Sequence, residues 1–96
     1  MIIYIDIDNT ICYTNGMNYE DSTPIVDNIE KANLLFDEGH TIVYWTARGS
    51  VTKKNWKKLT MDQLNKWNVK YHKLVFKKPP FDLLIDDKVL NTRDWI

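Results

Sequence analysis

The sequence predicts an α/β fold: a three-layer α/β/α sandwich around a Rossmann-like, mostly parallel sheet. Short runs rich in β-branched and aromatic residues alternate with segments whose apolar residues recur at helical spacing. Each apolar run ends in polar residues, and parallel strands gather such ends at one edge of a sheet, where ligands bind. A chain of 96 residues is expected to form a single domain, residues 1–96.

The first half of the chain is expected to form two strands with one helix between them. The first strand should cover residues 2–7, and the polar stretch 8–23 should form a loop. Pro24, preceded by capping side chains, is typical of a helix start, and Gly39 is typical of a helix end. The β-branched and aromatic run 41–45 predicts the second strand.

The second half is expected to add one helix and two more strands. Apolar residues at helical spacing predict a helix over residues 52–68, and a third strand should cover 73–76. Pro79-Pro80 breaks the chain, and the apolar run 82–85 predicts a fourth strand. The element order is therefore β-α-β-α-β-β.

Composition indicates a cytoplasmic protein with no membrane partner. No apolar stretch reaches the roughly 18 residues that a spanning helix needs, and the N-terminus meets Asp6 too early for a signal peptide. Cys12 is the single cysteine, so an internal disulfide is excluded, which fits a reducing compartment.

Charge is zero overall but unevenly distributed. Residues 1–47 hold eight acids and one base, whereas residues 48–80 hold ten bases and one acid. An acidic metal-binding wall beside a basic wall would suit an anionic substrate. The alternative is that most of the lysines solvate one helix; these are Lys53, Lys54, Lys57, Lys58 and Lys66.

Two carboxylates, Asp6 and Asp8, lie two residues apart at the end of the first strand. Such residues point to the same side of a strand, so their charges repel unless a cation lies between them. Mg²⁺ prefers oxygen ligands and would remove that repulsion. One carboxylate can then attack phosphorus, while the other protonates the leaving oxygen and later deprotonates water. Asn9 is a candidate substrate contact, and Thr10 is expected to be structural; an acidic turn capped by Thr10 is the alternative.

Phosphate-binding candidates follow the second and third strands. The Thr46 hydroxyl and nearby backbone N–H groups, including that of Ala47, can hold phosphate oxygens, and Arg48 could add a bidentate contact. Lys78, favoured over Lys77, would neutralise phosphate charge and hold Asp6 in place.

Asp86 and Asp87 close the predicted fourth strand. A role in solubility is a poor explanation for two adjacent acids after a wholly apolar run, and a metal-related role is favoured. The predicted Mg²⁺ site therefore draws on Asp6, Asp8, Asp86 and Asp87.

The ordered set D-x-D-x-T, Thr, Lys and Asp-Asp resembles the haloacid dehalogenase superfamily of aspartyl phosphatases over residues 2–87. The resemblance implies that Asp6 is the nucleophile that becomes aspartyl phosphate. It implies that Asp8 is the general acid/base, with its backbone carbonyl on Mg²⁺. An acid at the Asp8 position is typical of phosphatases and phosphotransferases and not of dehalogenases.

The same resemblance implies that Thr46 and Lys78 bind phosphate and that Asp86 and Asp87 form the acidic metal motif, with Asp87 the expected direct ligand. A finer resemblance links this chain to small phosphatases encoded in capsule or surface-polysaccharide gene sets, which favours a phosphorylated sugar or other small metabolite. The short stretch between Thr10 and the first helix leaves no room for a cap domain, so the mouth should be open.

The expected function is Mg²⁺-dependent hydrolysis of a phosphomonoester. One alternative is a nucleic-acid 3′-phosphatase or nucleotidase that uses the basic region 48–78. A phospho-accepting signalling module without turnover is an alternative of another class, although there the acid pair precedes the acceptor. The sequence leaves open which ester is hydrolysed and how many copies assemble.

Overall fold

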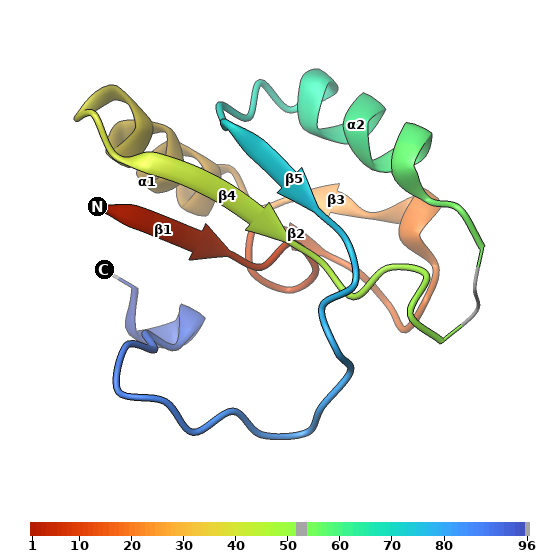
Figure 1. Ribbon diagram of the computed structural model, residues 1–96. Helices are drawn as coiled ribbons and strands as arrows, with labels where there is room; N and C mark the ends of the chain where they lie inside the picture. The colour runs from red at the N-terminus through yellow and green to blue at the C-terminus, as the bar shows by residue number, and fades with distance from the viewer. Residues whose placement is uncertain (52–53, 96) are drawn as a thin grey trace.

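Three parallel strands form the main sheet in the computed structural model, which describes residues 1–51 and 54–95 (Figure 1). They are β1 (Ile2–Ile5), β4 (Thr41–Trp45) and β5 (Lys73–Val75), in the order β1-β4-β5. Because both strand pairs are parallel, the carboxyl ends of all three strands meet at one edge of the sheet. The expected parallel α/β sheet is confirmed for these strands.

Two helices accompany the sheet. Helix α1 (Val26–Asp37) packs against β4, and helix α2 (Lys57–Lys66) precedes β5. Gly39 follows α1 with φ +97°, a left-handed conformation that ends helices readily. The buried core joins residues of the strands, of the turn after β1 and of both helices, namely Ile5, Ile7, Ile11, Ile29, Ala32, Ile42, Tyr44 and Leu64.

The helix boundaries differ from the sequence prediction mainly at their starts, while β1 ends at Ile5 instead of residue 7 and α2 ends at Lys66 instead of residue 68. Pro24 is not helical: Thr23–Pro24 forms β3, which pairs antiparallel with β2 (Cys12–Tyr13), and α1 begins at Val26. The expected loop 8–23 therefore contains strand β2 and a short 3₁₀ helix, η1 (Tyr19–Asp21). Strands this short carry too little periodicity to be recognised in a sequence.

The predicted start of the second helix, residues 52 and 53, lies outside the described residues. Among the residues that follow, helix α2 begins at Lys57, with Trp56 as its N-cap. The Trp56 ring packs edge-on against the Tyr19 ring at 5.0 Å between centroids. This contact buries Trp56 before the helix starts.

The predicted fourth strand, 82–85, is wrong for this chain: no regular element forms there. Residues 79–91 instead form an extended arm that leaves the end of β5 and swings away from the sheet (Figure 1). The physical reason is the short connection between the Lys77-Lys78 pair and the predicted strand. Its three residues, Pro79, Pro80 and Phe81, are too few for the crossover that a further parallel strand requires. After the arm, a 3₁₀ helix, η2 (Thr92–Asp94), returns the chain to the body.

Within the described residues, no helix is both long enough and apolar enough to cross a bilayer.

Candidate active site

A hollow of about 320 Å³ opens at the carboxyl ends of the parallel strands. Its lining includes half of the residues that the sequence singled out, which are Asp6, Asp8, Ala47, Arg48 and Lys78. Gly16, Tyr19, Pro79, Pro80 and Phe81 complete the wall. The fold therefore brings together two acids that follow β1, the guanidinium in the loop after β4 and the amine that follows β5.

Asp6 faces Lys78 across this hollow. The Lys78 Nζ atom lies 3.3 Å from Asp6 Oδ1, and the Thr10 hydroxyl donates to Asp6 Oδ2 at 3.5 Å. Burial raises the pKa of the Asp6 carboxyl above its usual range, and the Lys78 charge opposes that rise. Asp6 thus has one cationic partner and a side chain that is 37% exposed.

Lys78, and not Lys77, supplies that amine, as expected. Its Nζ also lies 5.4 Å from the ring centroids of Trp45 and Phe81. Its backbone N–H donates to the Thr46 carbonyl at 3.1 Å, which ties the lysine to the end of β4. Lys77 is exposed and adopts a left-handed φ of +75°.

Asp8 is held by Arg48 through two guanidinium N–H groups. Nη2 donates to Asp8 Oδ1 at 2.8 Å, and Nε donates to Asp8 Oδ2 at 3.1 Å. The Thr14 hydroxyl adds a 2.6 Å hydrogen bond to Asp8 Oδ1. A carboxylate with this many donors has a fixed orientation.

The other side of the Arg48 guanidinium is fixed by helix α2. Nη1 donates to Thr60 Oγ1 at 3.0 Å and to Gln63 Oε1 at 2.6 Å. Gln63 in turn donates to the Tyr19 carbonyl at 2.6 Å. Sequence reasoning did not give Thr60 or Gln63 a role in the site. The signal that could have found them was polar residues at core-facing helix positions, since buried polar groups need partners.

Arg48 is therefore placed differently from the substrate contact that the sequence suggested. The residue is only 3% exposed, and the protein occupies N–H groups on every nitrogen of its fork. In this arrangement Arg48 holds Asp8, and Lys78 supplies the positive charge beside Asp6 in the hollow.

Thr46 and Asn9 also lie away from the hollow. Thr46 is fully buried, and its hydroxyl accepts the backbone N–H of Arg48 at 3.1 Å. Asn9 lines a neighbouring hollow with Tyr13 and Thr14, and its Oδ1 accepts the Thr14 N–H at 3.2 Å. Both side chains shape the loops that carry Arg48 and Asp8.

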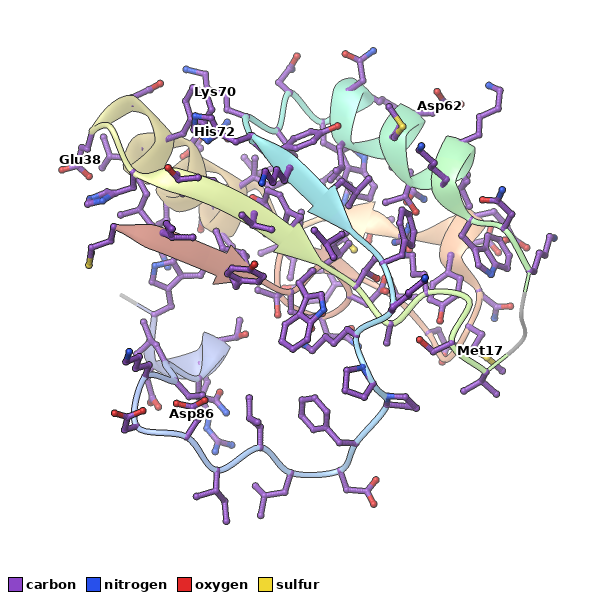
Figure 2. All side chains as sticks on the ribbon, in the orientation of Figure 1. Met17, Glu38, Asp62, Lys70, His72 and Asp86 are labelled. Atoms are coloured by element: carbon purple, nitrogen blue, oxygen red, sulfur yellow. The ribbon has the colours of Figure 1, made fainter. Side chains whose placement is uncertain are left out.

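The acidic pair Asp86-Asp87 lies on the arm and does not line the hollow. Figure 2 shows Asp86 on the part of the arm that stands away from the sheet. Its Oδ1 accepts the Lys88 backbone N–H at 2.9 Å, which lowers the pKa of Asp86. Among residues 1–51 and 54–95, no three His, Cys, Asp or Glu side chains are grouped closely enough to hold a metal ion. The predicted four-acid site is therefore not assembled within one chain.

Comparison with solved structures finds a similar fold in an MCSG target from Vibrio cholerae, known from a crystal structure. The two chains are 26% identical, with a TM-score of 0.83, and the match covers 98% of this chain and 86% of that chain. No protein-family model and no curated protein matches this sequence. The likeness supports the α/β fold that the strands and helices define.

Proposed function

We propose that this protein is a Mg²⁺-dependent phosphomonoester hydrolase that works through an aspartyl phosphate on Asp6. The observation that carries the proposal is the 3.3 Å pairing of Asp6 with Lys78 in a hollow that Asp8 also lines. A carboxylate nucleophile, an amine for the phosphoryl oxygens and a second carboxyl group for proton transfer are the groups that this reaction needs.

The first step joins Asp6 to phosphorus. Lys78 binds a phosphoryl oxygen, an Asp6 oxygen forms a bond to phosphorus, and the bond from phosphorus to the ester oxygen breaks. Asp8, as the general acid of this step, passes a proton to the departing alkoxide. In the second step water attacks the same phosphorus and gives a proton to Asp8, which releases phosphate and restores Asp6. Arg48 keeps the Asp8 carboxyl group aimed during both transfers.

Magnesium would supply positive charge against the developing negative charge on the phosphoryl oxygens. The Asp6 carboxylate and the Asp8 backbone carbonyl would hold the ion, and both are hard oxygen donors of the kind that Mg²⁺ requires, with waters and substrate phosphate as its further ligands. Asp86 and Asp87, expected as further ligands, do not line the hollow of their own chain.

As part of this proposal, the chain is a capless member of the haloacid dehalogenase superfamily with a Rossmann-like, three-layer architecture. The substrate class that fits is a phosphorylated sugar or other small metabolite, because a hollow of about 320 Å³ suits a small molecule.

The test is phosphate release from a panel of sugar phosphates, nucleotides and 3′-phosphorylated oligonucleotides, with and without Mg²⁺. We expect Mg²⁺-dependent turnover that Asp6→Asn abolishes. The matched control is Asp62→Asn on the exposed surface of α2 (Figure 2), which should retain full activity. Turnover that survives Asp6→Asn would contradict the proposal. A long-lived phosphorylated protein without turnover would instead favour a signalling module, and salt-sensitive activity on oligonucleotides alone would favour the nucleic-acid alternative.

A further inference from the structure

The outer edge of β1 is open. Strand β1 pairs with β4 on one side, and the described part of the chain places no strand on its other side. Ile2 and Tyr4 on this strand are 71% and 59% exposed. An open edge beside apolar side chains is a template for pairing with another strand, and native proteins normally cover it.

The arm carries the apolar residues that could cover this edge. All of its large apolar side chains are exposed, a pattern that marks an interaction site: Phe81, Leu83, Leu84, Ile85, Val89 and Leu90. The run Leu83-Leu84-Ile85 also has the composition of a strand, although the chain leaves it unpaired.

Both ends of the arm are tied to the carboxyl end of β1. At its start, Lys78 pairs with Asp6, and at its end the Thr92 hydroxyl hydrogen-bonds the Thr10 hydroxyl at 3.0 Å. Further along, Lys31 Nζ donates to the Trp95 carbonyl at 2.7 Å. The arm is therefore a closed loop whose middle projects outward from two fixed points.

The arm cannot lie parallel to β1 of its own chain. It starts at the carboxyl end of β1 and runs opposite to the β1 arrow (Figure 1). A parallel alignment would require a return to the amino end of β1 first, and parallel connections need about a dozen residues. The four Cα–Cα steps from Lys78 to Asp82 span at most about 14 Å, which does not allow a crossover.

We propose that two copies of this chain exchange arms around a two-fold axis. The axis lies across the strands and reverses the direction of the arm, so the partner's 82–85 run is parallel to β1 and pairs with its open edge. The same contact forms twice, because a two-fold interface is self-complementary. A second copy is the occupant that the geometry favours, since each copy offers both an open edge and an unpaired apolar run.

The exchange also completes the site, a consequence that rests on the proposed function. A parallel partner strand ends at the same sheet edge as β1, so the partner's Asp86 and Asp87 arrive beside Asp6 and Asp8. This explains why the acids that the sequence groups together are separated within one chain. Each active site would then take its nucleophile from one copy and its acidic pair from the other.

The first test is the mass in solution, which does not depend on catalysis. Light scattering after size exclusion should give about twice the chain mass of 11.4 kDa. The double variant Leu84→Pro/Ile85→Pro removes neighbouring N–H donors, which face both sides of a strand, and should be monomeric. Its control, Val89→Pro/Leu90→Pro, makes the same change outside the pairing run and should remain dimeric. A monomeric wild type, or a dimer insensitive to the first variant, overturns the proposal.

The second test is complementation between inactive variants, co-expressed and purified together. Asp6→Asn and Asp86→Asn/Asp87→Asn should each be inactive. Mixed dimers contain one intact site, so random pairing restores about a quarter of wild-type activity. Co-expression of Asp6→Asn with Lys78→Met should restore no activity, because Asp6 and Lys78 act within one chain.

The outcomes of the two tests separate the two proposals. The exchange is overturned if co-expressed Asp6→Asn and Lys78→Met restore activity. It is also overturned if the wild type is active but co-expressed Asp6→Asn and Asp86→Asn/Asp87→Asn restore none. If the wild type hydrolyses no phosphate ester, the proposed function fails, while the dimer mass and its dependence on Leu84 and Ile85 still decide the exchange.

Discussion

The Arg48 guanidinium and the Asp8 carboxylate form a two-point ion pair across the loops that follow β4 and β1, with Nη2 to Oδ1 at 2.8 Å and Nε to Oδ2 at 3.1 Å. The Arg48 side chain is completely buried, while the Asp8 side chain is 22% exposed. One end of the pair is thus locked into the core beside α2, and the other end reaches the hollow. This arrangement makes Arg48 a positioning residue for Asp8.

Breaking this pair should destabilise the protein strongly. Arg48→Met leaves Asp8, Thr60 and Gln63 without their shared donor, and we expect the unfolding free energy to fall by about 3 kcal/mol. Urea denaturation measures this loss. Lys58→Met at the exposed Lys58–Asp62 pair, where the N–O distance is 3.0 Å, is the control and should change the unfolding free energy by less than about 1 kcal/mol. Equal losses in the two variants would contradict the large contribution to stability that we assign to the Arg48–Asp8 pair.

Replacing Lys78 should reduce activity much more than replacing Lys77. Lys78→Met removes the cation beside Asp6, and we expect a loss of about 100-fold or more in kcat/KM, the size seen when one transition-state donor is removed. Lys77→Met changes an exposed side chain and should leave kcat/KM within about twofold. Steady-state kinetics at saturating Mg²⁺ provide the comparison. Similar losses in both variants would contradict the assignment of Lys78.

Tyr44 offers a stability prediction outside the site. Its hydroxyl is buried and, among the described residues, lacks a hydrogen-bond partner, and burial raises the pKa of this phenol. Tyr44→Phe removes the unsatisfied group and should raise the unfolding free energy by about 1 kcal/mol. Tyr13→Phe, at a tyrosine that is 63% exposed, should change little. A marked destabilisation by Tyr44→Phe would show that the hydroxyl has a partner.

Asp6 should make stability depend on pH in the metal-free protein. Burial raises the pKa of folded Asp6 above its ordinary value of 3.8, so the folded state binds this proton more tightly than the unfolded state. The resulting stabilisation is complete below pH 3.8 and is lost as pH rises through the raised folded pKa. Relative to Asp6→Asn, the wild type should therefore lose stability over that window and then keep a constant difference. Urea denaturation in the presence of a chelator provides the measurement. An unfolding free energy that rises with pH in the wild type, relative to Asp6→Asn, would contradict the predicted direction.

The sequence predicted the parallel strands well because long β-branched runs leave few alternatives. Strand 41–45 has the expected bounds, and Asp6, Asp8 and Lys78 gather where parallel strand ends were expected to meet. The environment of Arg48 was harder to predict from the sequence, because its contacts with Thr60 and Gln63 depend on how α2 packs.

The arm shows a different limit of sequence reasoning. Leu83-Leu84-Ile85 carries a strand signal, but the position of a strand also depends on whether the preceding link can reach its place in the sheet. The three-residue link 79–81 was visible in the sequence, and its length was the signal that a fourth parallel strand could not close within one chain.

The most direct test of the central claim is the detection of the covalent intermediate. Wild-type protein mixed with Mg²⁺ and a hydrolysed ester, then quenched in acid, should carry one phosphoryl group on the peptide that contains Asp6. Mass spectrometry should find no such adduct on Asp6→Asn, and Asp62→Asn should behave as wild type. Phosphorylation of a different residue, or rapid turnover in which Asp6 never carries the group, would contradict the account.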